Sequence, residues 1–269
     1  MTHTENLVHY DEQYIGHRSR WRVAYYHLAA AIERFLGIGS IVDMGCAAGF
    51  LVEFCRVRGF EAYGVDISPD AQTFWPKEHL TYYTIGDISD NQLNFVPTRY
   101  VSCMEVAEHL RKDQSGALVA NLVKHHPEAV LFTAAPLGAS KDPTHQNEQP
   151  YQYWIEHFSS DSYQIEPGLS CAFRVYLRQH GGIPYWYIRN LMVFVPNGTS
   201  SYTFDIDYQA EEQRFLEMEY LMLSQLRELS VENHLHHIEE IHELYRPKVL
   251  HAADCMFTVD ENGFILIKG

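Results

Sequence analysis

Basic residues are scarce in this sequence. Its 20 Lys and Arg residues stand against 35 Asp and Glu residues, which gives a formal net charge of −15 at pH 7. Proteins that bind nucleic acid over a broad surface usually present a clustered basic face. The acidic balance therefore predicts no nucleic-acid partner, and it disfavours large RNA or DNA substrates.

Long apolar runs and paired cysteines are also missing. No apolar stretch approaches the ~20 residues of a membrane-spanning helix, and the polar N-terminal residues do not resemble a signal peptide. The cysteines, at positions 46, 55, 103, 171 and 255, show no Cys-x-x-Cys spacing. They are expected to be small buried side chains in a reducing compartment. We therefore expect a soluble, cytoplasmic protein without a membrane partner.

Residues 41–50, with the sequence IVDMGCAAGF, predict a strand, a turn of small residues and a helix. Small residues allow a ligand to lie directly against the backbone. The turn has no Lys, as a Walker loop would, and its glycines are not spaced as Gly-x-Gly-x-x-Gly. Asp43, two residues before Gly45, favours a ligand with an ammonium group and hydroxyls. An ordinary strand-turn-helix corner is the alternative interpretation.

Acidic residues also follow the next two predicted strands. Residues 61–66 predict a second strand that ends in Asp66, and a short third strand leads to Asp87 and Ile88. In an open parallel sheet, ligands bind beyond the carboxyl ends of the strands. Asp66 could accept hydrogen bonds from both hydroxyls of a ribose. Enzymes that use NAD share such an acid, so a dehydrogenase remains an alternative at this point.

A fourth strand, at residues 100–105, runs into the motif Glu-Val-Ala-Glu-His-Leu. The four motifs, in this order, resemble those of class I S-adenosylmethionine-dependent methyltransferases, although the first motif has Ala47 where the family usually has glycine. The resemblance covers roughly residues 35–195. It implies S-adenosylmethionine as the cofactor and the following cofactor-binding residues: Asp43, Gly45, Cys46, Ala47, Gly49, Asp66, Ile67, Asp87, Ile88, Met104 and Glu105.

Strands and helices alternate along most of the chain. This alternation predicts an α/β fold with a doubly wound sheet, and the resemblance implies a mostly parallel, seven-stranded sheet of the Rossmann-like methyltransferase type. The remaining strands are expected at 129–136, 162–167 and 185–195, and helices at 21–36, 49–58, 117–126, 151–158 and 169–180.

Two domains are expected from this pattern. Residues 1–198 are interpreted as the methyltransferase domain, with an N-terminal helical cover from which Tyr10 and Arg20 could line the site. Residues 199–269 are expected to form a C-terminal helical extension and a β-hairpin, because an Asn-Gly pair separates two apolar runs. The apolar stripe at 207–245 favours packing on the domain or a homodimer.

Two groups of residues could assist the chemistry. S-adenosylmethionine carries an activated methyl group, so the enzyme must align an acceptor and, for a hydroxyl, help to remove its proton. Glu105, Glu108 and His109 are expected at the end of the fourth strand and in the first turn of the helix that follows it, and His145 in a loop after the fifth strand. His109 and His145 are the candidate catalytic bases.

The Glu-x-x-Glu-His motif with a later His resembles small-RNA 2′-O-methyltransferases and ubiquinone-biosynthesis O-methyltransferases, in which these residues hold a divalent cation. The resemblance implies that Glu105, Glu108, His109 and His145 are metal ligands, for Mg²⁺, Mn²⁺, Fe²⁺ or Zn²⁺. The motif also occurs in methyltransferases without a metal. In that alternative, Glu108 caps a helix and His109 packs or acts as a plain base.

Aromatic residues occur near both expected loops of the site. Tyr151 and Trp154 follow the loop that contains His145, and Tyr185, Trp186 and Tyr187 could form a wall for a ring substrate or pack at the edge of the sheet.

The sequence thus predicts a methyltransferase that transfers a methyl group to a hydroxyl of a small molecule such as a sugar, diol or catechol, with a metal as a candidate participant. The alternatives are an N-methyltransferase of a small molecule, an NAD(P)-dependent oxidoreductase, and a non-catalytic protein that binds S-adenosylmethionine.

Overall fold

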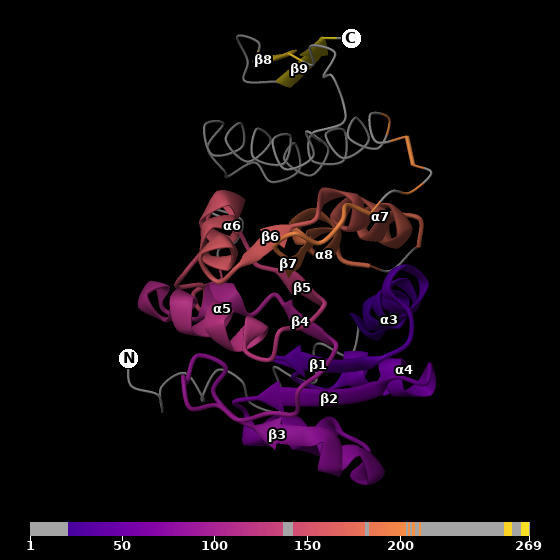
Figure 1. Ribbon diagram of the computed structural model, residues 1–269, viewed down its shortest axis with the longest axis vertical. Coiled ribbons are helices and arrows are strands. Elements are labelled where there is room, and N and C mark those ends of the chain that lie inside the picture. Colours follow the sequence, from indigo (N-terminus) through magenta and orange to yellow (C-terminus); the bar gives the residue numbers. More distant parts are fainter. Residues whose placement is uncertain are drawn as a thin grey trace.

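A seven-stranded sheet runs through the centre of the protein (Figure 1). The computed structural model describes residues 21–136, 142–180, 183–202, 204, 206–207, 210, 256–259 and 265–268. The strands lie in the order β3-β2-β1-β4-β5-β7-β6, and only β7 runs antiparallel to its neighbours. This arrangement confirms the expected doubly wound, mostly parallel sheet. The strands are β1 (Ser40–Met44), β2 (Glu61–Asp66), β3 (Tyr83–Ile85), β4 (Tyr100–Met104), β5 (Ala129–Thr133), β6 (Tyr163–Ile165) and β7 (Met192–Pro196).

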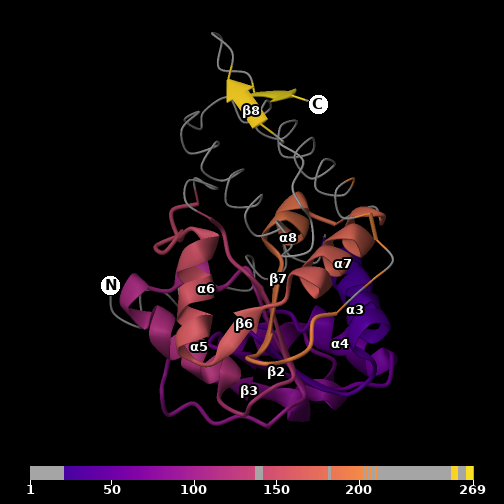
Figure 2. The ribbon, with the colours of Figure 1, turned by 45° about the horizontal axis from the view of Figure 1, so that its top comes forward.

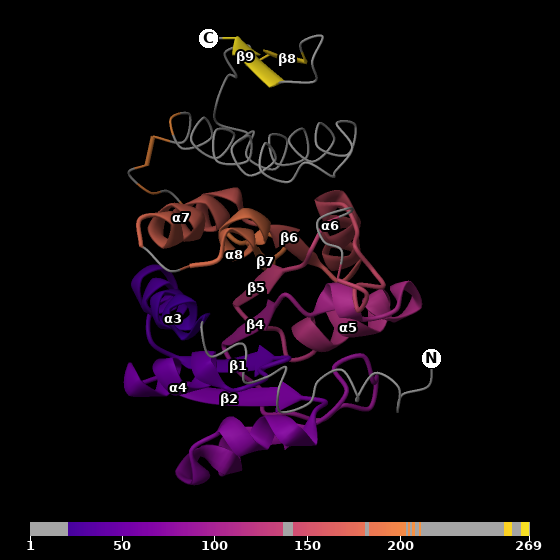
Figure 3. The same ribbon diagram turned by 180° about the vertical axis from the view of Figure 1, so that it is seen from behind.

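Helices cover both faces of the sheet (Figure 1 and Figure 3). Because successive side chains of a strand point to opposite faces, Ile41 packs into one core while Val42 and Met44 pack into the other. The view in Figure 2 shows α6 and α7 on opposite sides of β6 and β7. The first core is covered by α3 (Arg22–Leu36), α4 (Phe50–Val57), α7 (Pro167–Arg178) and α8 (Tyr185–Asn190), and the second by α5 (Ser115–Val123) and α6 (Tyr151–Ser160).

The strand expected at residues 185–195 is wrong over its first half. Tyr185–Asn190 forms the helix α8, and only Met192–Pro196 forms β7. Aromatic and β-branched residues favour a strand at this position, but tertiary contacts override that preference. The hydroxyl of Tyr187 lies 2.8 Å from that of Tyr25 in the core, an arrangement that the helical turn makes available.

Short 3₁₀ helices follow β2 and β4. Pro69 begins η2 (Pro69–Phe74), and η3 (Lys77–Tyr82) follows it. After β4 the chain forms η4 (Ala107–His109) and η5 (Lys112–Gln114) before α5 begins. The motif with the candidate catalytic residues therefore occupies a tight turn rather than the first turn of an α-helix.

Near its C-terminal end, the chain forms a separate two-stranded antiparallel sheet of β8 (Met256–Val259) and β9 (Ile265–Lys268). The expected helix at 207–245, apart from two single positions, lies outside the described residues, as do Tyr10 and Arg20. The homodimer contact expected from the apolar stripe at 207–245 therefore also lies outside the described residues. No helix in the described part of the chain has the length and hydropathy that a membrane span requires.

Candidate active site

The turn between β1 and α4, residues 45–49, requires glycine at two positions, and we refer to it as the glycine turn. Gly45 and Gly49 have φ angles of 81° and 71°, in the left-handed region that glycine adopts readily. A Cβ at Gly45 would lie 2.5 Å from Cγ2 of Val106, and one at Gly49 would overlap the indole of Trp75. Val106, just after β4, and Trp75, just after η2, therefore pack directly on this turn. Ala47, where the family usually has glycine, also has a positive φ, of 44°.

Asp66, at the carboxyl end of β2, points toward the glycine turn. Its Oδ2 accepts a hydrogen bond from the Ala47 amide at 2.7 Å, and its Oδ1 accepts one from the Ser68 amide at 2.9 Å. A carboxylate has about four lone-pair sites, so these two amides orient Asp66 in a way that is compatible with accepting ribose hydroxyls. Trp75, which the sequence interpretation did not single out, donates from Nε1 to the Ala47 carbonyl at 3.1 Å.

Asp43, at the end of β1, is a second buried acid beside the turn. Burial raises its pKa to about 7; the hydrogen bond that Ser102 Oγ donates to its Oδ1 at 2.8 Å opposes this shift, and the nearby charge of Asp66 adds to it. A cation next to this pair would favour the ionised carboxylates. The two acids therefore fit a ligand with a positive charge and hydroxyls, as S-adenosylmethionine has.

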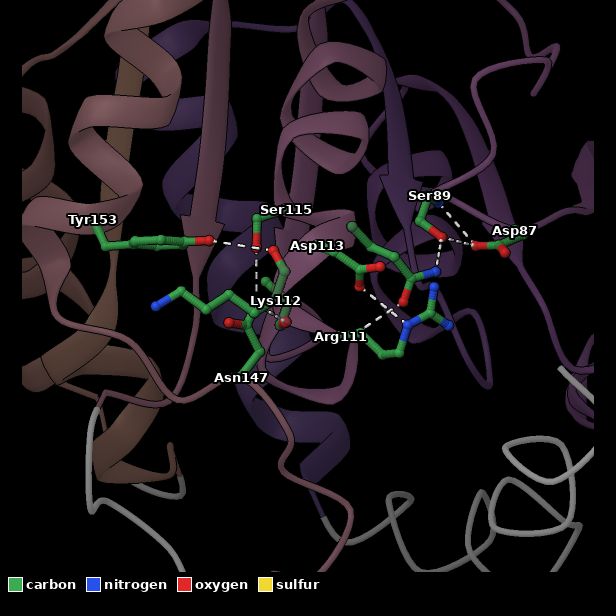
Figure 4. A network of polar contacts seen from close by, with 10 residues as sticks. Asp87, Ser89, Arg111, Lys112, Asp113, Ser115, Asn147 and Tyr153 are labelled. Atoms are coloured by element: carbon green, nitrogen blue, oxygen red, sulfur yellow. Dashed lines mark hydrogen bonds and ion pairs between the residues drawn. The ribbon is translucent and has the colours of Figure 1, made fainter. Parts of the chain in front are cut away.

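Asp87 belongs to a polar network that follows β3 (Figure 4). Its Oδ1 accepts hydrogen bonds from the Ser89 amide at 2.8 Å and from Ser89 Oγ at 2.7 Å. Gln114 of η5 donates to Ser89 Oγ at 2.6 Å. On the other side of η5, Asn147 donates from Nδ2 to Ser115 Oγ at 2.9 Å. Gln114 and Ser115, at the end of η5 and the start of α5, thus lie between Asp87 and the loop that contains His145.

The remaining candidates for cofactor binding are apolar or small. Ile88 and Met104 are buried, in the cores on opposite faces of the sheet. Cys46 is buried in the glycine turn, and burial raises the pKa of its thiol well above the ordinary value, so that the thiol is neutral. Ile67 is half-buried after β2.

Glu105 sits in a strained position at the carboxyl end of β4. Its φ is 55°, and its amide donates to both the carbonyl and the hydroxyl of Thr133, at 3.1 and 2.7 Å. Its Oε1 accepts from Nδ2 of Asn190 at 3.0 Å. Asn190 in turn accepts from the Tyr151 hydroxyl and from Arg189 Nε, at 3.1 and 2.8 Å. The sequence carried no signal for Asn190, because it fell within a predicted strand.

Glu108, His109 and His145 come together beyond the end of β4, and we call these three residues the Glu-His-His cluster. Each offers a ligand atom, and these atoms all lie within 4.8 Å of one another. The rings of His109 and His145 are 4.8 Å apart and nearly perpendicular. One carboxylate and two imidazoles form a donor set that suits Mn²⁺, Fe²⁺ or Zn²⁺. Glu105, the fourth residue predicted for the metal, is not a member of this cluster.

The loop after β5 is anchored on η4. The Glu108 carbonyl accepts hydrogen bonds from the amides of Gln146 and Asn147, at 2.8 and 2.9 Å. Because β4 and β5 are parallel neighbours, the segments that follow them start at the same edge of the sheet. This pairing brings His145 to His109.

Three polar residues of this loop surround the imidazoles. Thr144 Oγ1 lies 3.0 Å from Nδ1 of His109 and donates to Asp142 Oδ1 at 2.6 Å. His145 Nδ1 lies 2.8 Å from Glu148 Oε1. Burial acts to raise the pKa of Asp142, but hydrogen bonds from the Thr144 hydroxyl and amide and the two nearby imidazoles lower it overall. Thr144 and Asp142 were missed in the sequence interpretation.

The aromatic candidates mostly pack in the core. Trp154 is fully buried with its ring centroid 5.1 Å from that of Phe132, and Tyr187 is buried against α3. Trp186 is partly exposed and meets the edge of Trp21 at 5.7 Å. The side chain of Tyr185 is outside the described part of the structure.

Comparison with solved structures finds similarity between this chain and several methyltransferases. It shares 14% identity with a TehB-like S-adenosylmethionine-dependent methyltransferase from Corynebacterium glutamicum, with a TM-score of 0.45 over 64% of this chain and 88% of that one. It shares 18% identity with magnesium protoporphyrin IX methyltransferase from Synechocystis with bound SAH, with a TM-score of 0.45 over 61% and 90% of the two chains. A comparison with curated proteins gives no match.

A family model assigns the chain directly. The model described as "Methyltransferase domain" matches residues 19–164, which is more than half of the chain and includes the glycine turn, both acids beside it and the Glu-His-His cluster. The tightly covered glycine turn and the oriented carboxylate of Asp66 fit the cofactor of this family. The chain therefore belongs to the methyltransferase domain family and is an S-adenosylmethionine-dependent methyltransferase.

Proposed function

We propose that the enzyme transfers the methyl group of S-adenosylmethionine to a hydroxyl of a small molecule, and that Glu108, His109 and His145 hold a divalent cation at the acceptor. The observation that carries the proposal is the convergence of these three side chains beyond the end of β4. Val106, which precedes η4, packs on Gly45 and so connects the two parts of the site.

The donor set supports a cation rather than a purely structural cluster. Glu108 is fully buried and His109 is 9% exposed, so their polar atoms lie where water is largely excluded. Buried ionisable groups are usually paired or bound to a metal. When bound, a divalent cation would lower the pKa of an acceptor hydroxyl and could bind a neighbouring oxygen of a diol or catechol.

The other residues of the site have separate tasks in this proposal. Asp66 holds the ribose hydroxyls and Asp43 contributes negative charge near the cationic donor, while the glycine turn allows close approach of the backbone. The acceptor oxygen loses its proton to water and gains the methyl group, and the donor leaves as S-adenosylhomocysteine. Alignment of the two reactants supplies much of the rate.

A small acceptor is favoured by the charge of the chain. With 35 acidic and 20 basic residues, the protein lacks the excess of basic groups that contacts with phosphate backbones normally need. A neutral sugar, diol or catechol meets no such requirement.

The test is an acceptor screen that records both metal dependence and the atom methylated. Release of S-adenosylhomocysteine is measured with panels of diols, catechols, sugars and amines, with Mg²⁺, Mn²⁺, Zn²⁺ or a chelator present. Mass spectrometry of the product then distinguishes O-methylation from N-methylation. We expect a hydroxyl acceptor and loss of turnover in the chelator.

His145→Ala is the informative variant, and His79→Ala, a change at a histidine of η3, is its matched control. We expect only His145→Ala to lose turnover and stoichiometric metal, while both variants bind S-adenosylhomocysteine as the wild type does. Metal-independent methylation of amines would overturn the proposal and favour the N-methyltransferase.

A further inference from the structure

A chain of hydrogen bonds leads from the Glu-His-His cluster into the loop after β5. It starts at Nδ1 of His109, passes through Oγ1 of Thr144 at 3.0 Å, and ends at Oδ1 of Asp142 at 2.6 Å from that hydroxyl. Asp142 Oδ1 also accepts from the Thr144 amide at 2.9 Å. Thr144 is therefore held by two hydrogen bonds to Asp142 in the same short turn, one from its hydroxyl and one from its amide.

The number of protons available to these hydrogen bonds decides which nitrogen of His109 carries the hydrogen. A threonine hydroxyl has one proton and two lone pairs. The ionised carboxylate of Asp142 can only accept, so the hydroxyl proton of Thr144 is directed to it. Thr144 Oγ1 must then accept from His109, and the hydrogen of the neutral imidazole lies on Nδ1. The lone pair of His109 consequently lies on Nε2.

His145 is arranged in the same way by a different partner. Its Nδ1 lies 2.8 Å from Oε1 of Glu148, and an ionised carboxylate requires a donor there. Its lone pair also lies on Nε2. Both imidazoles thus have their Nδ1–H groups bound by the loop after β5, and both keep Nε2 as the nitrogen that can donate a lone pair.

We infer that Thr144 and Asp142 are positioning residues that hold His109 in its Nδ1-protonated tautomer, with Nε2 presented as a ligand for a divalent cation. This inference rests on the proposed function for its cation, but the tautomer itself does not depend on a bound metal. Residues that bind the second nitrogen of a metal-binding histidine orient the ring and raise its basicity.

Thr144→Val tests the inference, because valine has nearly the shape of threonine but no hydroxyl. The tautomer of His109 is read from long-range ¹H–¹⁵N NMR spectra of the metal-free protein, with its signals assigned by their loss in His109→Gln. We expect the Nδ1-protonated form in the wild type and a mixture of tautomers in Thr144→Val. Thr144→Ser, which restores a hydroxyl, should restore the wild-type spectrum.

Metal affinity provides the second readout. Titration with Mn²⁺, followed by electron paramagnetic resonance of the free ion, should show about 10- to 100-fold weaker binding in Thr144→Val. The matched control is Thr73→Val, which removes a hydroxyl that bonds to the Asp70 carbonyl in η2. The control should bind Mn²⁺ as the wild type does.

The outcomes separate this inference from the proposed function. An Nε2-protonated His109 in the wild type, or unchanged tautomer and Mn²⁺ affinity in Thr144→Val, would overturn the inference even if the enzyme methylates hydroxyls. Absence of Mn²⁺ binding by the wild type would overturn both the role of His109 Nε2 as a cation ligand and the proposed metal site. A wild-type Nδ1-protonated spectrum would then identify His109 Nε2 as the position of a plain base.

Discussion

The glycine turn and the Glu-His-His cluster are neighbours in space, yet they are assembled differently. The glycine turn is made by consecutive residues, and its geometry follows from the left-handed backbone at Gly45 and Gly49. The Glu-His-His cluster combines η4 with a loop that follows the next strand of the sheet. A local site of the first kind depends on its own residues, whereas a site of the second kind also depends on what holds its two segments together.

This difference predicts how each region responds to mutation. Changes in the glycine turn should alter cofactor binding and stability together, because the backbone itself makes the site. Changes of the side chains in the Glu-His-His cluster should remove catalysis with little effect on the cofactor. The predictions that follow test this separation.

The largest effect is expected for Glu108→Gln, which keeps the size of the side chain and removes its charge. Turnover should fall by about 10²- to 10⁴-fold, the range for loss of assisted proton removal, with unchanged affinity for S-adenosylhomocysteine. Glu156→Gln on α6, where the side chain is exposed, is the matched control. A parallel loss of cofactor affinity in Glu108→Gln would show that the two regions are not separable.

A change in pH dependence is expected for Asp43→Asn. The pKa of Asp43 is raised from 3.8 to about 7 in the folded protein by burial, against the hydrogen bond from Ser102. The folded state therefore binds this proton more tightly than the unfolded state does. The resulting stability is fully present below about pH 4 and is lost as the pH rises through 7, an effect on the order of 4 kcal/mol.

Urea unfolding of the wild type and Asp43→Asn at several pH values between 4 and 8 measures this contribution. As the pH rises across that interval, the unfolding free energy of the wild type should fall relative to that of Asp43→Asn. Parallel pH profiles would rule out the raised pKa of Asp43.

The glycine turn can be tested with a pair of glycines that share a positive φ angle. Gly45 and Gly37 have φ angles of 81° and 82°, but a Cβ at Gly37 would meet nothing within 4 Å. Alanine at either position should cost about 1–3 kcal/mol for the positive φ, and at Gly45 the close contact with Val106 adds to this cost. Only Gly45→Ala should also weaken S-adenosylhomocysteine binding, by about tenfold or 1.4 kcal/mol, in calorimetric titration. Equal affinities in the two variants would contradict the role of the turn.

The smallest effect is expected for Ser89→Ala. This change removes one of the two hydrogen bonds that Ser89 donates to Asp87, and it removes the acceptor of Gln114. A single hydrogen bond contributes about 0.5–1.5 kcal/mol, so cofactor affinity should fall by less than about tenfold. Ser160→Ala, at an exposed position on α6, should leave the affinity unchanged.

Much of the fold was predictable because its signals are local. The nearly wholly apolar segment of β5 indicates a strand buried on both faces, and the acids near the carboxyl ends of β1 and β2 mark where these strands stop. The segment 185–195 was predicted wrongly as one strand because its aromatic residues favour a strand. In the structure Tyr185–Asn190 is helical, and Tyr187 packs there against Tyr25. Propensity is a weak guide when a few buried contacts decide the conformation.

The sequence by itself determined the order of the motifs, the glycine turn and the acids beside it, since each depends on neighbouring residues and on the backbone conformations they allow. Only the tertiary structure brought Thr144 to His109 and Asn190 to Glu105, across separations of 35 and 85 residues. The physical reason is the topology of the sheet. Parallel pairing of β4 with β5 places the segments after both strands at one edge, and no local pattern records which side chains will meet there.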